Sequence, residues 1–250
     1  RGAPHRVRNP MSKPCAAVCR PQPFRQPQRQ HRGGQGVFGE GRAAPVIRIA
    51  LTKGRIEKSA LEILKACGYD VGELEAKGRK LIFRTGNLEI VLAKAADVIT
   101  YIDRGVCDVG FVGSDTINEH GGNFYEMLDL GFGVCRFALA GLRGQDFYSG
   151  YQHKVVATKY PVVARKYFSE KGVDCEIVRI DGSVELAPLL GLADAIVDIV
   201  ETGATLRENG LEVYEDILPV SARCIVNAVS IKLKNAEIGE FLRRVEEAKA

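Results

Sequence analysis

Short apolar runs alternate with segments of helical periodicity along most of this chain, and this alternation limits the fold more than any other feature. An apolar run at 46–51 precedes a segment, 56–67, whose apolar residues recur at helical spacing and which ends at Gly68. The same order of strand and helix returns between residues 154 and 172. Strands that alternate with helices are typical of α/β proteins with largely parallel sheets.

The alternation falls into two clusters of segments. We expect strands at 46–51, 80–85, 88–93, 107–113, 154–161 (ending in a turn), 175–180, 194–200 and 223–234, and helices at 56–67, 96–105, 162–171, 183–191 and 238–245. This order predicts an α/β fold of two lobes with mixed, largely parallel sheets and a ligand cleft between the lobes. Residues 46–138 and 215–250 are predicted to form the first lobe, and residues 139–214 the second.

Residues 1–45 differ from the rest of the chain in composition. They carry nine Arg or Lys and one acid, a balance of +8, so the remainder sums to −4 although the whole chain is +4. They also hold seven of the ten prolines. Such a segment buries too little surface to offset chain entropy, and we predict a disordered basic leader outside the fold. Few aromatic residues interleave its charges, so we expect no nucleic-acid partner.

The cysteines and the lengths of the apolar runs help to predict the cellular location of the protein. The seven cysteines are scattered, and the chain lacks the pair of CxxC motifs that would predict a zinc site. It also lacks a run of about 18 apolar residues, so no membrane span is expected. Residues 1–45 contain no apolar core of a secretory signal. We therefore expect a cytoplasmic protein with reduced thiols.

The stretch "DAIVDIVETGATLRENG" (194–210) begins as a buried strand and then breaks into acids, hydroxyls and a glycine. Gly203 lets the backbone approach a ligand closely, and a helix that begins near Ala204 would point its positive end at an anion. Thr202 and Thr205 can donate hydrogen bonds to phosphate oxygens. These residues predict a phosphate site at the carboxyl end of a strand.

Two acids accompany this predicted phosphate site. Asp198 and Glu201 repel phosphate, but they can accept hydrogen bonds from sugar hydroxyls or hold Mg²⁺. An acidic strand end followed by Thr-Gly-x-Thr therefore favours a ligand that contains both ribose and phosphate. The alternative explanation is a helix whose N-cap is Thr202, which accounts for one threonine and for neither acid.

Basic residues stand at two further positions. Lys53 and Arg55 flank a glycine at a helix start, where the helix dipole disfavours cations, and this cost indicates a bound anion. A solvated turn explains the same motif equally well. Arg79 lies in a basic cluster before a strand and by itself says little.

Two other segments have weaker signals. Ser183 and Glu185, at the start of a short helix, could add phosphate or ribose contacts, although an N-cap and a favourable dipole charge also explain them. The strand "CDVGFVGSD" (107–115) could form a wall for a planar ring, which makes Asp108 and Gly110 candidate ATP contacts, together with Arg55. No histidine has the spacing of a catalytic triad.

The run "GSVELAPLLGLADAIVDIVETGATLRENGL" (182–211) closely resembles the signature of the ATP phosphoribosyltransferase family. The segments "IALTKGRI", "RKLIF", "GVCDVGFVGSD", "FYEMLDLGFGVCRFALAG", "VATKYP" and "SARCIVN" fall in the order and spacing of the same family. The resemblance covers about residues 46–235. It implies a two-lobed fold like that of type II periplasmic binding proteins, with the active site in the cleft.

The resemblance also implies a reaction and its site. The family condenses ATP with phosphoribosyl pyrophosphate to give phosphoribosyl-ATP and pyrophosphate, with Mg²⁺, as the first step of histidine biosynthesis. Residues 198–206 match the family's phosphoribosyl pyrophosphate loop, so that Asp198, Glu201, Thr202, Gly203, Ala204 and Thr205, with Ser183 and Glu185, are the expected binding residues. Lys53, Arg55 and Arg79 match basic residues of its active site and are expected to be catalytic.

Only 16 residues follow Lys234, too few for the regulatory domain of the long-form members, so the chain resembles the short form. That form implies a regulatory subunit like histidyl-tRNA synthetase in a hetero-octamer, with a homodimer as the state of the chain alone. Two rival hypotheses are another phosphoribosyltransferase and a non-enzymatic, two-lobed solute-binding protein. Other phosphoribosyltransferases usually have two adjacent acids before the loop, whereas Asp198 and Glu201 are separated by two residues. A solute-binding protein requires export, and no secretory signal is seen.

Overall fold

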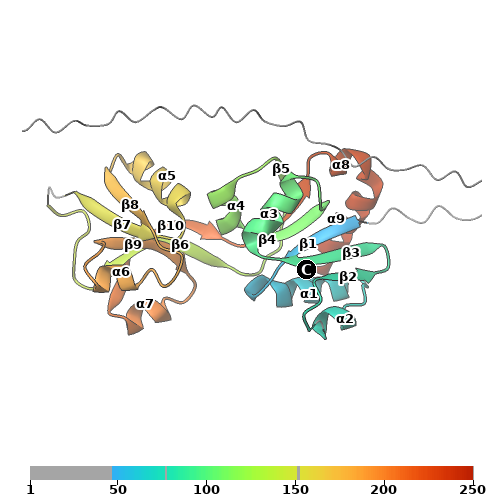
Figure 1. Ribbon diagram of the computed structural model, residues 1–250, viewed down its shortest axis with the longest axis horizontal. Helices are drawn as coiled ribbons and strands as arrows, with labels where there is room; N and C mark the ends of the chain where they lie inside the picture. The colour runs from blue at the N-terminus through green and yellow to red at the C-terminus, as the bar shows by residue number, and fades with distance from the viewer. Residues whose placement is uncertain (1–46, 77, 151–152, 250) are drawn as a thin grey trace, which may run out of the picture. The chain divides into compact units, whose positions relative to one another are not determined.

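The computed structural model describes residues 47–76, 78–150 and 153–249 (Figure 1). The predicted basic leader at 1–45 lies outside these described residues. Within them, no helix is both long enough and apolar enough to cross a membrane.

One sheet has six strands in the order β2-β3-β1-β4-β11-β5. Its strands are β1 (Ile47–Thr52), β2 (Ile82–Thr85), β3 (Leu88–Ala93), β4 (Val109–Gly113), β5 (Phe124–Asp129) and β11 (Ala222–Asn227). Strand β1 pairs in parallel with β3 and β4, and the other three pairings are antiparallel. The helices that accompany it are α1 (Arg55–Ala66), α2 (Gly72–Glu75), α3 (Ala95–Asp103), α4 (Ser114–His120), α8 (Ser230–Leu233) and α9 (Asn235–Ala248).

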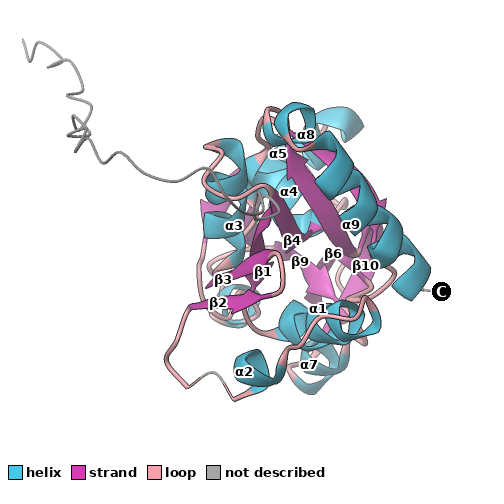
Figure 2. Cartoon of the chain, turned by 90° about the vertical axis from the view of Figure 1, so that its right-hand side faces the viewer, coloured by secondary structure: helices cyan, strands magenta, loops and turns pink. Residues whose placement is uncertain are grey.

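The two faces of this sheet are covered by different helices. Alternate residues of β1 point to opposite faces: Ile49 and Leu51 pack against α1, α2 and α9, whereas Ala50 packs against α3. The apolar spacing predicted for 56–67 therefore makes one side of α1 part of the core. Figure 2 shows α9 as the long helix near the carboxyl end of the chain.

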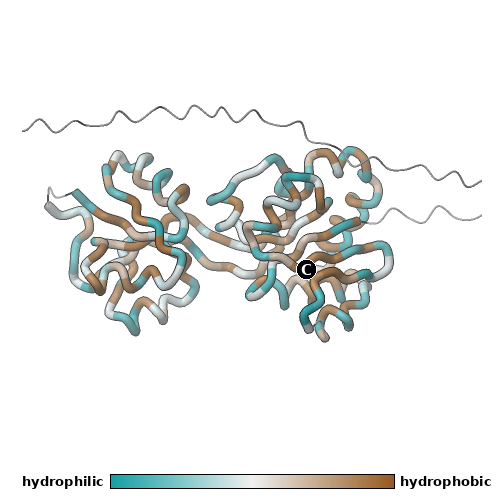
Figure 3. Tube along the Cα trace, viewed as in Figure 1, coloured by the Kyte–Doolittle hydropathy of each residue, from teal (hydrophilic) through white to brown (hydrophobic). Residues whose placement is uncertain are grey.

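The second sheet has five strands in the order β10-β6-β9-β7-β8. They are β6 (Cys135–Leu142), β7 (Lys154–Thr158), β8 (Cys175–Arg179), β9 (Ala195–Val200) and β10 (Leu211–Val220). Strand β7 pairs in parallel with β8 and β9, and β6 pairs antiparallel with both β9 and β10. Helix α5 (Pro161–Lys171) packs on one face, and α6 (Leu186–Leu189) and α7 (Ala204–Glu208) on the other. In Figure 3 the hydrophobic segments concentrate in the strands of both sheets.

The predicted α/β fold with mixed sheets is confirmed, but antiparallel pairing has a larger share than we expected. The sheets also mark where the chain passes from one to the other, between β5 and β6 and again between β10 and β11. The boundaries expected at 138/139 and 214/215 fall inside β6 and β10. The long strands β6 and β10 pair with each other and belong wholly to the five-stranded sheet. The chain therefore changes sheet before β6 and after β10, and not within these strands.

The long strand predicted at 223–234 is wrong. Strand β11 ends at Asn227, and the chain continues into α8. The side-chain oxygen of Asn227 accepts hydrogen bonds from the backbone amides of Val229 and Ser230, both at 2.9 Å. Its amide nitrogen donates to the carbonyl of Ile102 at 2.7 Å. An asparagine that bonds its own backbone two and three residues later turns the chain and ends the strand.

Candidate functional site

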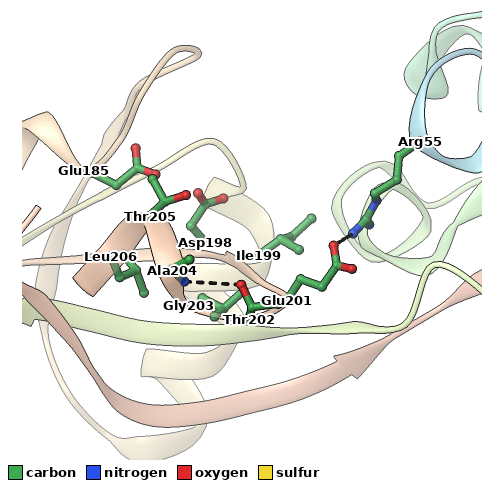
Figure 4. Close-up of a pocket in the computed structure, with 11 residues that line it drawn as sticks. Arg55, Glu185, Asp198, Ile199, Glu201, Thr202, Gly203, Ala204, Thr205 and Leu206 are labelled. Carbon is green, nitrogen blue, oxygen red and sulfur yellow. Dashed lines mark hydrogen bonds and ion pairs between the residues drawn. The ribbon is translucent and has the colours of Figure 1, made fainter. Parts of the chain in front are cut away.

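A cavity of about 270 Å³ opens at the carboxyl end of β9 (Figure 4). Its lining consists of the strand end and loop at 198–206, Glu185 before α6, and Arg55 at the start of α1. Strand β9 lies between β6 and β7 inside its sheet, and its first three residues are fully buried. The strand therefore holds the loop on a rigid support.

The backbone of the loop requires glycine at position 203. Gly203 has φ +71° and is the N-cap of α7, and residues with a side chain rarely adopt this left-handed conformation. An added Cβ would lie 3.3 Å from Nη1 of Arg207, which donates to the Thr202 carbonyl at 2.9 Å. Thr202 precedes the cap, and its hydroxyl accepts the Ala204 amide at 3.3 Å. Since Gly203 occupies the cap position, the alternative explanation of Thr202 as N-cap is wrong.

Two carboxylates and a hydroxyl gather on one side of the cavity. Figure 4 shows the side chains of Asp198, Glu185 and Thr205 pointing toward one another. Burial, with the nearby charge of Glu185, raises the pKa of Asp198 to about 6, although the Ile199 amide and Lys159 act in the opposite direction. A carboxylate that is costly to ionise gains from any ligand that donates hydrogen bonds or brings a cation.

The other acid of the loop turns away from this cluster. Glu201 accepts a hydrogen bond from Nη1 of Arg55 at 3.1 Å, and Nη2 of Arg55 donates to the Cys135 thiol at 3.4 Å. The thiol and the carboxylate both raise the pKa of Arg55. The two side chains are 46% and 62% exposed, so water competes with the pair and it stabilises the fold little. A ligand phosphate could therefore replace Glu201 as the partner of Arg55.

Five predicted site residues lie outside the cavity lining, and three of them, Lys53, Arg79 and Ser183, are exposed. Lys53 is exposed in the turn between β1 and α1, where its amide donates to the Ala93 carbonyl at 2.8 Å. Arg79 is exposed in the segment before β2. Ser183 is exposed too, and the N-cap of α6 is Glu185, so the N-cap explanation of Ser183 is wrong.

The structure gives Asp108 and Gly110 roles other than contact with ATP. Oδ2 of Asp108 accepts Nζ of Lys234 at 2.7 Å and the Arg48 amide at 2.8 Å, at the edge of the sheet opposite to Arg55. Gly110 is buried within β4, and an added Cβ would lie 2.9–3.1 Å from side chains of α3 and β11. The glycine serves close helix packing, and the ATP contacts expected of both residues stay a prediction.

Comparison with known proteins identifies the family. Residues 94–247 match the family model described as HisG, ATP phosphoribosyltransferase. A curated relative from Clostridium kluyveri, named ATP phosphoribosyltransferase, is 59% identical over 202 residues, 80% of this chain and 92% of that protein.

This chain belongs to the ATP phosphoribosyltransferase family. Membership confirms the predicted pentosyltransferase activity, the condensation of ATP with phosphoribosyl pyrophosphate in the first step of histidine biosynthesis. It also decides against both rival hypotheses.

Two solved structures resemble the fold. The ATP phosphoribosyl transferase (HisG:HisZ) complex from Thermotoga maritima has a TM-score of 0.72 at 33% identity, covering 82% of this chain and 98% of that one. The periplasmic aliphatic sulphonate binding protein SsuA from Escherichia coli has a TM-score of 0.53 at 14% identity, covering 82% and 73%. The second likeness concerns the fold alone, and together they confirm the predicted architecture like that of a periplasmic binding protein.

One cation near the site of this ATP phosphoribosyltransferase was missed from the sequence. Lys159 directly follows β7, and the parallel pairing of Thr158 with Val197 places it at the same sheet edge as Asp198. Its charge lowers the pKa of Asp198. The sequence does contain a sign of this cation, because "VATKYP" has a lysine directly after a strand, as "ALTKGR" has at Lys53.

The cavity suits magnesium only in company with a substrate. Across the described residues, no group of three His, Cys, Asp or Glu is arranged to hold a metal ion. Asp198 and Glu185 nevertheless supply two carboxylates on one side of the cavity. Mg²⁺ commonly takes one or two carboxylates together with substrate phosphates, so the residues fit that mode of binding.

Proposed function

We propose that the cavity at the end of β9 is the phosphoribosyl pyrophosphate site of this enzyme, with Arg55 facing the pyrophosphate. One observation carries the proposal. Among the residues that line the cavity, Arg55 is the cation and stands opposite a cluster of two carboxylates and a hydroxyl. A ligand with a diphosphate at one end and sugar hydroxyls in the middle matches this separation of charge.

The loop supports the rest of the ligand. The backbone amides of Gly203, Ala204 and Thr205, with the hydroxyls of Thr202 and Thr205, would donate to the 5′-phosphate. Asp198 and Glu185 would accept hydrogen bonds from the ribose hydroxyls. Asp198 is the more strongly favoured acceptor, because burial raises its pKa and a donor from the ligand would relieve that cost.

Catalysis then depends on charge and position more than on a base. Adenine N1 attacks the anomeric carbon with its own lone pair, while the bond to the pyrophosphate oxygen breaks and its electrons leave with pyrophosphate. Arg55 would exchange Glu201 for this growing negative charge, and the loop would hold the sugar for in-line attack. Glu201 thus positions Arg55 in the free enzyme.

Two further cations stay as predictions. Lys53 stands two residues before Arg55, and Arg79 precedes β2, so both come from segments of the six-stranded sheet. Neither lines the cavity. We propose that they contact ATP or pyrophosphate once both substrates fill the space beside Arg55.

Mg²⁺ is the proposed cofactor. Asp198 and Glu185 would hold it together with oxygens of the substrate. When bound, the ion neutralises charge on the departing pyrophosphate.

We also propose a regulatory partner and a cytoplasmic location. The similarity to a chain of a HisG:HisZ complex supports a second kind of subunit. In our proposal this subunit is regulatory and related to histidyl-tRNA synthetase, the complex is a hetero-octamer, and the chain alone forms a homodimer. The match over 98% of that chain is consistent with the short form. The two lobes of the proposed enzyme follow the two sheets, with the cavity at the carboxyl end of β9.

Steady-state turnover of ATP and phosphoribosyl pyrophosphate with Mg²⁺ tests this function, with phosphoribosyl-ATP followed by its absorbance. We expect turnover by the chain alone that added histidine does not inhibit. Saturable binding of phosphoribosyl pyrophosphate without turnover would assign catalysis to the complex with the partner. Turnover that survives replacement of both Asp198 and Arg55 would contradict the location of the site.

A further inference from the structure

Helix α5 of the five-stranded sheet takes its N-terminal cap from another part of the chain. Its N-cap residue is Tyr160, whose side chain makes no capping bond, and its first turn contains no acid. The first amides of a helix have no partner within the helix and need one elsewhere. The amides of Val162 and Val163 donate to the carboxylate of Glu119, at 3.0 and 3.2 Å to Oε2.

Glu119 belongs to α4, which follows β4 of the six-stranded sheet. The cap therefore joins helices that follow strands of different sheets. A carboxylate at a helix N-terminus gains from charge-assisted hydrogen bonds and from the helix dipole. A second bond joins the same pair of helices, because the Tyr160 hydroxyl donates to Oδ2 of Asp115 at 3.2 Å. Asp115 and Glu119 are four residues apart and so share one face of α4.

The α5 side of this contact is tied to the substrate site. The Thr158 hydroxyl donates to the Val197 carbonyl, directly before Asp198, at 2.6 Å and accepts the Tyr160 amide at 2.9 Å. The Tyr160 ring packs edge-on against Phe137 at 4.9 Å. A shift of the start of α5 would therefore move the strand that carries Asp198.

The α4 side is tied to the cation. Strand β4 leads directly into α4 and pairs in parallel with β1, with Leu51 opposite Phe111. Strand β1 leads through the turn at Lys53 into α1, whose first residue is Arg55. The contact between α4 and α5 thus connects the support of Arg55 with the support of the loop at 198–206.

We infer that Glu119 is a positioning residue, which holds Arg55 and the phosphoribosyl pyrophosphate loop at the separation that the reaction requires. Asp115 and Tyr160 assist it. Glu119 touches no substrate in this assignment, and it acts by joining the two helices. The inference rests on the proposed site, and turnover of the variant that lacks both Asp198 and Arg55 tests that site separately.

The test compares Glu119→Ala and Glu119→Gln with wild type in steady-state kinetics of the full chain, with both substrates varied. Glu170→Ala is the matched control, because Glu170 is an exposed glutamate in the last turn of α5. We expect Glu119→Ala to raise KM for phosphoribosyl pyrophosphate about tenfold, and to do so more than it lowers kcat. Glu119→Gln keeps an acceptor oxygen and should restore part of the affinity, and Glu170→Ala should leave KM unchanged.

A purely structural role predicts a different pattern. It would lower Tm and the concentration of active sites, while the remaining enzyme kept the wild-type KM, and that result would overturn the inference. If Glu119→Ala does not fold, Tyr160→Phe breaks the second bond with little loss of volume. A rise of threefold or more in KM for Tyr160→Phe, with an unchanged active-site concentration, would support the same role, and an unchanged KM for this variant would overturn it.

Discussion

The junction from β9 to α7 and the junction from β1 to α1 are built from the same elements, and they differ in the chemistry that they present. The first offers a buried acid, two threonines and a glycine with φ +71°. The second offers Lys53 and Arg55 around a glycine with φ +97°. A strand that ends in a left-handed glycine before a helix is thus a shared support, and the neighbouring side chains decide what it binds.

This difference shows how the charges of the site are divided. In the proposed site, the five-stranded sheet supplies the groups that would accept hydrogen bonds from sugar hydroxyls and bind phosphate, and the six-stranded sheet supplies the cation Arg55. They meet where Arg55 contacts Glu201 at 3.1 Å. Each half alone would bind part of phosphoribosyl pyrophosphate, and only the two together would stabilise a departing pyrophosphate.

The largest effect should come from the cation. Arg55→Ala should lower kcat/KM by about 10²–10³, because Arg55 in the proposed site faces charge that grows in the transition state. Arg55→Lys keeps the charge and should recover part of the loss. Arg165→Ala, which removes an exposed arginine of α5, is the control and should leave kcat/KM unchanged. Steady-state kinetics measure all three, and an unchanged kcat/KM for Arg55→Ala would remove the cation from the mechanism.

Asp198→Asn should raise the free energy of unfolding and weaken the binding of phosphoribosyl pyrophosphate. The pKa of Asp198 is raised to about 6 in the folded chain, above the usual value of about 4. The contribution of Asp198 to the free energy of unfolding therefore falls as pH rises from about 4 to about 6, and it stays reduced above that range. Removing the charge should raise stability at pH 8 by about 1–3 kcal/mol and reduce the pH dependence between 4 and 6.

Chemical denaturation at pH 4 and pH 8 measures this effect, with the exposed Asp174→Asn as the control. The same Asp198→Asn variant should raise KM for phosphoribosyl pyrophosphate, since it loses a charged acceptor. A variant that gained no stability at pH 8 would show that the acid is already compensated in the free enzyme.

Gly203 should be required in the loop because of its backbone conformation, with φ +71°. Gly203→Ala forces a side chain into the left-handed region, which costs about 1–2 kcal/mol. We expect the loop to shift and KM for phosphoribosyl pyrophosphate to rise about tenfold. Gly239→Ala in α9 is the control, because that helical position has open space and alanine favours helices. Equal effects of the two substitutions on KM would refute the requirement for glycine in the loop.

The smallest effect on stability should come from the contact between the two junctions. Glu201→Gln removes one charge of an exposed ion pair, so the free energy of unfolding should change by less than about 1 kcal/mol. We expect KM for phosphoribosyl pyrophosphate to stay within about threefold of wild type, because in the proposed mechanism Glu201 leaves Arg55 when pyrophosphate arrives. A rise of more than tenfold would instead assign Glu201 to the ribose beside Asp198.

Local patterns predicted most of the elements that support the site. Strands were predicted at 80–85 and 88–93, and β2 and β3 pair there as a hairpin whose turn contains Gly86 at φ +54°. The loop at 198–206 was also predicted, because its residues are consecutive in the sequence. The strand predicted at 223–234 failed because of a distant partner: Asn227 ends β11 with bonds to its own backbone and to Ile102 of α3.

The sequence by itself determined the alternation of strands and helices, the family, and the acids, hydroxyls and glycine of the loop, since all of these depend on residues close together in the chain. The tertiary structure decided which charges meet. Arg55 and Glu201 are 146 positions apart, and Glu119 caps a helix that begins more than 40 residues later. Contacts over such separations depend on how strands pair and helices pack, and no periodicity in the chain encodes them.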